Sequence, residues 1–273
     1  MPRWRAPRRY GSLSHPREDP VPAALSVNIN KYALLRNSRG ECAAPDLLRA
    51  VDVCLAAGCH GITVHPRRDE RHIRFTDVPL VKAHLDAHHP GVEYNIECEP
   101  APAILDLVLA ERPAQCTLVP VRPGEVTSDH GWDLPNDASV LRGPVARLKA
   151  AGIRVSVFMQ VDASASSLQC AADLGIDRIE LYTGPYAEAW GTGEQQTATE
   201  AMFGVAARAD RCGLGLNAGH DLDRHNLAAI RDLPGLLEVS IGHAQIVRAL
   251  DVGTTQSIRE LLGALGWPSP AFG

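Results

Sequence analysis

Eight short apolar segments recur along this chain and alternate with longer segments of helical periodicity. The apolar segments span residues 25–29, 61–64, 92–96, 115–119, 154–159, 178–181, 215–217 and 237–241. Helices are expected at residues 45–57, 76–87, 101–110, 138–151, 163–174, 194–212 and 257–265. Several of the apolar segments are continuous rather than alternating, which is typical of parallel strands covered by helices. The pattern therefore predicts an α/β protein with a parallel sheet.

A glycine repeatedly separates a helical segment from the next strand. It occurs in the phrases AAGCHGI, AAGIRVS and ADLGIDRIE, at Gly58, Gly152 and Gly175. Glycine ends helices readily because it adopts the left-handed conformation at no steric cost. Eight strand–helix units in 273 residues favour one closed (β/α)8 TIM barrel. The alternative is an open doubly wound sheet, which usually has a glycine-rich phosphate loop after its first strand. Here that strand leads into NKYALLRNSRG, which contains no such motif.

Composition and charge limit the partners and the compartment. The formal net charge of −5 argues against a nucleic-acid partner. Residues 1–24 are rich in arginine and proline and lack periodicity, so we expect a flexible N-terminal extension, followed by one barrel domain at 25–265 and a tail at 266–273. The sequence contains neither a secretory apolar region nor an apolar run of about 18 residues, so no membrane span is expected. The seven scattered cysteines form no CxxC pair, which indicates a cytoplasmic protein rather than a disulfide framework.

Polar side chains stand at or just past the ends of the expected strands. They are Asn28, His65, Glu97, Thr127, Glu180, His220 and His243. In a TIM barrel the C-terminal ends of the strands meet at one mouth, where active sites lie. Carboxylates and imidazoles in such a mouth can exchange protons near neutral pH. The pattern therefore predicts an acid–base site, with a structural ion pair to an arginine as the alternative for either glutamate.

Two regions have the composition of anion-binding sites. GITVHPRRDERHI places Arg67, Arg71 and His72 after the second strand. The guanidinium group of arginine can donate two parallel hydrogen bonds to two oxygens of one phosphate. A solvated charged loop is the alternative for this run. NAGHD and SIGHA place Gly219 and Gly242 beyond the last two strands, where TIM barrels often hold a phosphate at a helix start. We therefore expect a phosphorylated substrate.

The same histidines and glutamates are of types that bind metals. They show neither HxH nor HExxH spacing, and arginines occupy the same loops. Cations there disfavour a divalent ion, so we expect no metal at the mouth. The long polar stretch at residues 121–137 is expected to be either a lid over the site or a surface loop without such a role.

Seven phrases, in this order, resemble the pyridoxine 5′-phosphate synthase family: VNINKYALLRNSRG, GITVHPRRDERHI, NIE, LVPVRPGEVTSDHG, IELYTG, LNAGHD and SIGHA. The resemblance runs from about residue 25 to residue 265. It implies a TIM barrel with additional helices, assembled as a homo-oligomer and typically an octamer. It also implies condensation of 3-amino-2-oxopropyl phosphate with 1-deoxy-D-xylulose 5-phosphate. The products are pyridoxine 5′-phosphate, phosphate and water, and no metal or redox cofactor takes part.

The resemblance also implies roles for particular residues. The implied proton acceptors are His65 and Glu97, the proton donor is His220, and the transition-state stabiliser is Glu180. The implied contacts of the amino-ketone phosphate are Asn28, Arg39, Asp221, Gly242 and His243. The implied contacts of deoxyxylulose phosphate are Asn30, Lys31, Arg67, His72 and Thr127.

Asn30, Lys31 and Asp221 depart from the family pattern. The family usually has aspartate and histidine at the first two positions and glycine at the third. Lysine can still bind an anion and asparagine a hydroxyl group, whereas the charge of the carboxylate is lost. Asp221 tolerates an unusual φ and could also cap a helix at residues 223–231.

Two other functions remain open from the sequence. Lys31 could form a Schiff base, as in class I aldolases, because it alone among Lys31, Lys82 and Lys149 lies near a strand end. A non-catalytic sugar-phosphate-binding protein is the second alternative. The set of acid–base residues argues against it, since binding alone does not need them.

Overall fold

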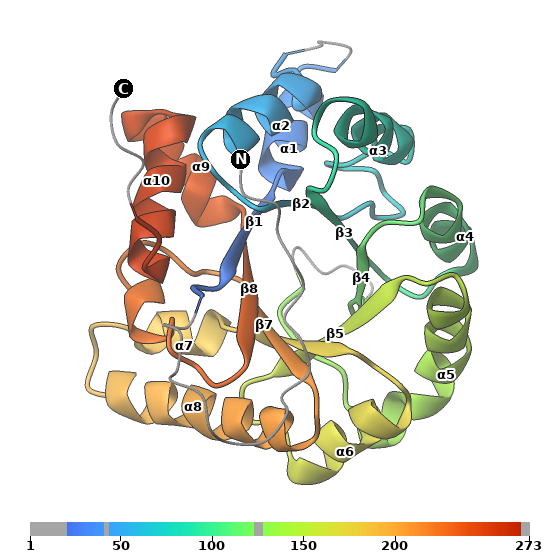
Figure 1. Cartoon of the computed structure of the whole chain (residues 1–273), viewed down its shortest axis with the longest axis vertical. Coiled ribbons are helices and arrows are strands. Elements are labelled where there is room, and N and C mark those ends of the chain that lie inside the picture. Colours follow the sequence, from blue (N-terminus) through green and yellow to red (C-terminus); the bar gives the residue numbers. More distant parts are fainter. Residues whose placement is uncertain (1–20, 41–43, 123–127, 269–273) are drawn as a thin grey trace.

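The computed structural model describes residues 21–40, 44–122 and 128–268, and within them eight parallel strands form a closed barrel in chain order (Figure 1). The strands are β1 (Ala24–Asn28), β2 (Gly61–Val64), β3 (Glu93–Cys98), β4 (Gln115–Leu118), β5 (Arg154–Gln160), β6 (Arg178–Tyr182), β7 (Gly215–Gly219) and β8 (Leu236–Ile241). β8 pairs back on β1 and closes the barrel. The expected TIM barrel is confirmed, and each strand end lies within two residues of its expected place.

Helices surround the barrel in Figure 1. They are α1 (Asn30–Asn37), α2 (Leu47–Ala56), α3 (Asp77–His88), α4 (Pro102–Glu111), α5 (Leu134–Ala150), α6 (Ala165–Asp173), α7 (Gly184–Ala189), α8 (Gln195–Arg211), the 3-10 turn η1 (Leu227–Ala229), α9 (His243–Val252) and α10 (Thr254–Leu265). The seven helices expected from periodicity are present, and α5 begins four residues earlier than expected. Helices α1, α7 and α9 are additional, and each begins within two residues of a strand end.

Apolar and polar residues alternate along the strands more strictly than expected from the sequence, which predicts several continuous apolar runs. Outward-facing residues such as Leu25 are fully buried in the core shared with the helices. Inward-facing residues are polar and bond one another across strands: the hydroxyls of Ser26 and Thr63 are 2.7 Å apart. Asn95 donates to Thr63 Oγ1 (3.3 Å) and accepts from Thr117 Oγ1 (3.2 Å). The inside of the barrel is therefore a polar column linked by hydrogen bonds between strands, although Gln115 Nε2 and Ser156 Oγ have no partner among the described residues.

Near the N-terminal ends of the strands this column carries charge. Arg178 Nη1 lies 3.4 Å from Glu238 Oε2 and 3.9 Å from Glu93 Oε1. Arg154 also pairs with Glu93. We refer to Glu93, Arg154, Arg178 and Glu238 as the floor of the barrel. The floor brings two buried carboxyl groups against two guanidinium groups.

The glycines between helices and strands have the conformation that the sequence predicts. Gly58, Gly152 and Gly175 follow α2, α5 and α6 with φ of 108°, 78° and 79°. Side chains with a Cβ rarely adopt these values. The repeated glycine is therefore the device that turns each of these helices back toward the barrel.

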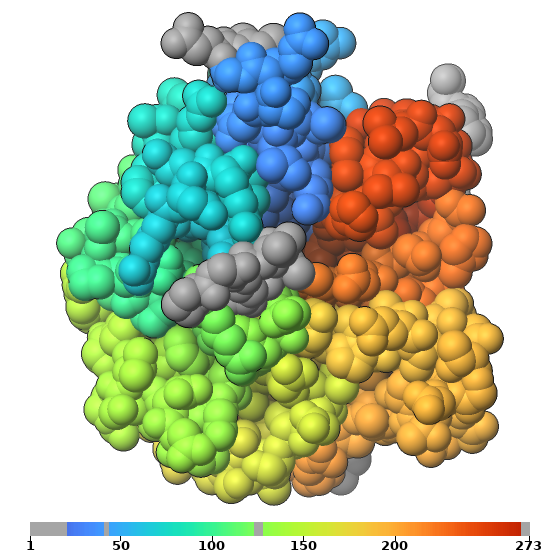
Figure 2. Space-filling view, turned by 180° about the vertical axis from the view of Figure 1, so that it is seen from behind, coloured from blue at the N-terminus to red at the C-terminus, as the bar shows by residue number. Residues whose placement is uncertain are grey.

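The two ends of the barrel chain lie side by side. In Figure 2 the blue segment that starts the barrel lies between the cyan segment after it and the red C-terminal helices. Trp267 Nε1 donates to Ala23 O at 2.8 Å, which links the end of α10 to the start of β1. In the part of the chain that the structure describes, none of the helices combines the length and apolar character needed to cross a membrane.

Candidate active site

A cavity of about 500 Å³ opens at the C-terminal ends of the strands. Its wall contains twelve of the fourteen site residues expected from the sequence: Asn28, Asn30, Lys31, His65, Arg67, His72, Glu97, Glu180, His220, Asp221, Gly242 and His243. They come from six different strand ends and the loops that follow. Residues far apart in the sequence thus share one mouth, because all strands of the barrel run in the same direction.

Two expected substrate contacts are not placed at the cavity. Arg39 is exposed in the turn after α1, where its backbone N–H donates to Arg36 O at 3.3 Å. The last residue of α1 in the cavity wall is Leu34, so the helix has left the mouth before Arg39 is reached. Thr127 lies outside the described residues.

A ring of contacts joins His65 to Glu97. His65 Nδ1 lies 3.5 Å from Glu97 Oε2, and Asn28 Nδ2 lies 3.4 Å from both oxygens of the same carboxyl. Asn28 Oδ1 accepts from the backbone N–H of Asn30 (3.0 Å), and Asn30 Oδ1 accepts from the backbone N–H of His65 (2.9 Å). Asn30 therefore uses its amide oxygen to position His65.

The imidazole of His65 is held in its neutral form. Burial lowers the pKa of His65 well below its usual value, and the positive charges of His72, Arg67 and Arg71 lower it further. Its Nε2 is buried and has no hydrogen-bond partner among the described residues, although it lies in the cavity wall. A neutral imidazole with an available nitrogen can accept a proton from a substrate.

Two buried carboxyl groups face the same cavity. Burial raises the pKa of Glu97 to about 7, although hydrogen bonds from Asn28 and Ser240 favour its ionised form. Burial and the charge of Glu97 raise the pKa of Glu180 to about 8, and Thr117 donates to Glu180 Oε2 at 3.4 Å. At neutral pH the two carboxyls therefore hold protons that ordinary glutamates would have lost.

Gly219 makes room for one of these carboxyls. It ends β7, and a Cβ at this position would lie 2.5 Å from Glu180 Oε1 and 3.3 Å from Ser240 O. Such distances are shorter than normal contacts. Gly219, which the sequence predicts to lie at an anion site, therefore also makes room for the Glu180 side chain.

His220 and Asp221 lie in a strained turn after β7. Their φ values are 88° and 56°, in the left-handed region that residues other than glycine seldom occupy. Thr183 holds this turn, because its hydroxyl donates to Gly219 O at 2.8 Å and also contacts His220 O. Asp221 Oδ2 lies 2.7 Å from His220 Nδ1. The expected tolerance of Asp221 for an unusual φ is confirmed, and its carboxylate orients the imidazole of His220.

The expected helix at residues 223–231 is wrong, and so is the expected cap from Asp221. Only the short turn η1 forms there. The side chain of Asp223, not Asp221, accepts from the backbone N–H groups of His225 (2.7 Å) and Asn226 (3.0 Å). Asp223 can therefore satisfy these donors without Asp221, whose carboxylate bonds His220.

The first cationic region of the cavity is formed by Lys31, Arg67, Arg71 and His72. Burial, followed by the charges of the two arginines, lowers the pKa of His72 to about 4. Asn37 Nδ2 donates to His72 O at 2.7 Å, so α1 holds the loop after β2 against the mouth. Several fixed positive charges on one wall suit an anionic group of a ligand.

The second region is the start of α9. Gly242 precedes this ten-residue helix, and His243 is its first residue. A Cβ at Gly242 would lie 2.8 Å from Asn28 O, so a larger residue does not fit. The N-terminus of a helix offers backbone N–H donors and a positive dipole end to an anion. The cavity thus has a possible anion site on each of two walls.

Sequence reasoning missed three residues that act at the mouth. Thr183 supports the His220 turn, Ser240 bonds Glu97, and Phe158 lies in the cavity wall. Ser240 and Phe158 face the interior of their strands, so a stricter reading of the two-residue alternation could have found them. The role of Thr183 depends on two backbone carbonyls of another strand and has no local signal.

Comparison with protein families places these features in a known group. A family model described as "Pyridoxal phosphate biosynthesis protein PdxJ" matches residues 25–266. The chain is 50% identical over 249 residues to pyridoxine 5′-phosphate synthase from Xanthomonas axonopodis pv. citri, which covers 88% of this chain and 96% of that protein. It is 45% identical over 248 residues to pyridoxine 5′-phosphate synthase from Allorhizobium ampelinum, with 90% and 99% covered. The similarity includes every described strand of the barrel.

Solved structures share the architecture at low sequence identity. Tryptophan synthase from M. tuberculosis in an aminoacrylate-bound form superposes with a TM-score of 0.60 at 14% identity, covering 89% of this chain and 94% of that one. The tryptophan synthase A-subunit from Pyrococcus furiosus gives a TM-score of 0.60 at 13% identity, with 89% and 98% covered. At such identities the likeness shows the fold alone.

Proposed function

Because this chain belongs to the family of the pyridoxal phosphate biosynthesis protein PdxJ, we propose that it is a pyridoxine 5′-phosphate synthase. The relatives are named as synthases, and the chain is accordingly a biosynthetic enzyme. In the proposed reaction 3-amino-2-oxopropyl phosphate and 1-deoxy-D-xylulose 5-phosphate are joined. The products are pyridoxine 5′-phosphate, inorganic phosphate and water.

One observation carries the proposal: a neutral imidazole and two carboxyls with raised pKa values face one cavity. Imine formation, elimination of phosphate, ring closure and the loss of water that follows each take a proton from one atom or deliver one to an oxygen. Such chemistry needs acids and bases whose pKa values lie near the working pH. A binding protein would not need to bury two carboxyls at the cost of their ionisation.

His65 and Glu97 are the proposed proton acceptors. Neutral His65 takes a proton on Nε2, the nitrogen in the cavity wall. The imidazolium that results has its Nδ1 3.5 Å from Glu97, so an ionised Glu97 would stabilise it. With a pKa of about 7, Glu97 can take a proton itself at another step and return it.

His220 is the proposed proton donor, and Glu180 the proposed stabiliser of charge in the transition state. The Asp221 carboxylate lies 2.7 Å from His220 Nδ1 and orients the imidazole in the cavity wall. Glu180, whose pKa is raised to about 8, is mostly protonated at neutral pH and can donate a hydrogen bond to a developing oxyanion. A protonated carboxyl does this without adding negative charge to the site.

The two anion regions are the proposed cradles for the two substrates. In this proposal Asn30, Lys31, Arg67, His72 and Thr127 contact deoxyxylulose phosphate, and Asn28, Arg39, Asp221, Gly242 and His243 contact the amino-ketone phosphate. A cavity of about 500 Å³ is of the size that holds small ligands. Arg39 and Thr127 remain predictions, because the structure does not place them at the cavity.

The proposal includes the setting of the reaction. The chain would act in the cytoplasm as a homo-oligomer, an octamer by family resemblance, on small phosphorylated substrates. It would use no metal or redox cofactor in this reaction and would bind neither nucleic acid nor a membrane. Its net charge of −5 supports the expectation about nucleic acid.

The direct test is product formation by the purified full chain from the two named substrates. Pyridoxine 5′-phosphate and inorganic phosphate should appear in equal amounts, and Glu97→Gln should suppress both together. Absence of product under conditions where both substrates bind would contradict the proposed function.

Two further outcomes would point to the alternatives. A borohydride-stable adduct on Lys31 with deoxyxylulose phosphate would indicate a Schiff-base enzyme. Calorimetric binding of both substrates without any turnover would indicate a binding protein.

A further inference from the structure

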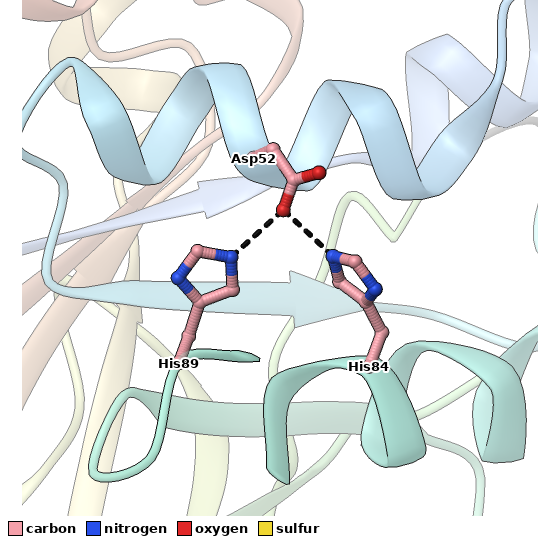
Figure 3. Close-up of side chains that lie close together, drawn as sticks. All are labelled: Asp52, His84 and His89. Atoms are coloured by element: carbon pink, nitrogen blue, oxygen red, sulfur yellow. Dashed lines mark hydrogen bonds and ion pairs between the residues drawn. The ribbon is translucent and has the colours of Figure 1, made fainter. Parts of the chain in front are cut away.

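A second cluster of ionisable side chains lies on the outside of the barrel, away from the cavity. Asp52 of α2 faces two histidines that come from α3 and from the residue after it (Figure 3). Nε2 of His84 lies 2.6 Å from Asp52 Oδ1, and Nε2 of His89 lies 2.7 Å from the same oxygen. None of the three residues belongs to the cavity wall.

The chain brings the second histidine into place by ending α3. His88 is the last helical residue, and His89 has φ −134° and ψ 52°. Pro90 follows, and a residue before proline avoids the helical conformation. His89 therefore leaves the helix path, and in Figure 3 its ring points up at Asp52 beside that of His84.

The three side chains have the chemistry of a transition-metal site. Two imidazole nitrogens and one carboxylate oxygen lie within 4.8 Å of one another, and such ligands suit Zn²⁺ and neighbouring divalent ions. No other three histidine, cysteine, aspartate or glutamate residues meet in this way in the described part of the chain. Imidazole ligands distinguish this trio from an ordinary acidic surface cluster.

The spacing needs only a small adjustment. Ligand atoms at about 2.0–2.1 Å from a tetrahedral zinc ion are roughly 3.3 Å apart. Here the two nitrogen–oxygen distances are 2.6 and 2.7 Å, so the rings would move outward by well under 1 Å. The Asp52 side chain is 48% exposed, so solvent can reach the remaining coordination position.

We propose that Asp52, His84 and His89 bind one divalent late transition-metal ion, with Zn²⁺ as the best-fitting ion. The ion would join α2 to α3 on the outer surface and stabilise that part of the barrel. It has no part in the proposed reaction at the mouth, so the two proposals can fail independently.

The test is binding of zinc chloride to the full chain after treatment with a chelator. Calorimetry should give one zinc ion per chain, and saturating zinc should raise the melting temperature by roughly 5 °C at about a hundred times the dissociation constant. Asp52→Asn and His89→Gln should each lower the affinity about tenfold or more. His88→Gln is the matched control: this residue is exposed and its ring centroid lies 4.8 Å from that of His84, but its nitrogens are outside the trio, so zinc binding should persist.

Cobalt(II) identifies the ligands directly. Tetrahedral nitrogen and oxygen ligation gives an intense visible spectrum, which Asp52→Asn and His89→Gln should abolish. Equal zinc affinity in the parent and in both variants would overturn the proposal, as would a thiolate charge-transfer band or loss of binding in His65→Ala alone. Melting curves in chelator show whether each variant is folded before metal is added.

Discussion

The barrel holds a pair of largely buried glutamates at each end, and the two pairs have different hydrogen-bond and ion-pair partners. At the floor, Glu93 and Glu238 lie against Arg154 and Arg178. At the mouth, hydrogen bonds reach Glu97 and Glu180 from uncharged donors such as Asn28, Ser240 and Thr117. Guanidinium groups thus pair with the carboxyls at the floor, whereas these hydrogen bonds at the mouth come from uncharged side chains.

The pKa values follow this difference. At the floor, burial alone would raise the pKa of Glu93, but Arg154 lowers it, while burial and the Glu93 charge raise that of Glu238. The pKa values of Glu93 and Glu238 therefore move in opposite directions, so the pair has one favoured protonation state. At the mouth both values rise together, to about 7 and about 8. The mouth therefore stores protons that are exchangeable near neutral pH, which is the property that acid–base catalysis needs.

The largest expected effect is on turnover at the mouth. His65→Ala and Glu97→Gln should each lower kcat by about 10²–10⁴-fold, the usual contribution of a positioned acid or base. The melting temperature should stay close to that of the parent, since both side chains face the cavity rather than the packed core. Steady-state assays and melting curves on the same samples check this, and activity near the parent level would remove that residue from the mechanism.

At the floor the same kind of change should cost stability instead. Arg178→Met removes a guanidinium that lies 3.9 Å from the ionised Glu93 and 3.4 Å from Glu238, so the free energy of unfolding should fall by about 3 kcal/mol. Arg147→Met is the matched control, because Arg147 pairs with Asp106 on the exposed surface and should cost no more than about 1 kcal/mol. Denaturant titrations measure both, and equal small losses would show that the floor charges are not needed for folding.

The comparison also predicts how stability depends on pH. A carboxyl with a raised folded-state pKa stabilises the fold below its unfolded pKa, and that contribution is lost as pH rises through the folded value of about 8. The Glu180→Gln variant has no ionisable group at this position, so it does not lose this contribution to stability as the pH rises. Relative to the parent, the variant should gain on the order of 4 kcal/mol between pH 5 and pH 9. Urea unfolding at both values measures the gain, and parallel pH profiles of parent and variant would contradict a raised pKa at Glu180.

The smallest expected effect concerns specificity within the mouth. Lys31 lines the cavity beside His72. Lys31→Met should raise KM for deoxyxylulose phosphate about tenfold to a hundredfold, since a charge-assisted hydrogen bond contributes roughly 1.5–3 kcal/mol. KM for the amino-ketone phosphate should change little. Lys82→Met, which removes only a surface pair with Asp86, is the control; equal effects on both substrates would refute the assignment.

The sequence predicted the barrel because its signals are local. Each strand is marked by its own apolar run, and glycines such as Gly58 and Gly152 mark the turns between helix and strand. The mouth residues could be predicted for the same reason, since a parallel barrel places every strand end at one face. His65 and Glu97 needed no knowledge of their partners to be assigned to one site.

What the sequence did not predict depends on contacts across the fold. The cap expected from Asp221 failed because its carboxylate bonds His220, whereas Asp223 bonds the donors of the next turn. Helix α1 carries Arg39 away from the mouth, although its start lies in the cavity wall. The floor pairs were also missed, because Glu93 and Arg178 are 85 positions apart and meet only inside the closed barrel.

The most direct test of the difference between the two ends is a pH titration of the glutamate carboxyl carbons by NMR, with carbon-13 in the side chains. The account predicts two signals that titrate near pH 7 and pH 8, of which Glu97→Gln removes one and Glu180→Gln the other. The Glu180 signal should shift to a lower pKa in Glu97→Gln, because its charged neighbour is gone. Titration of both mouth carboxyls in the ordinary acidic range, with no signal lost near neutral pH in either variant, would contradict it.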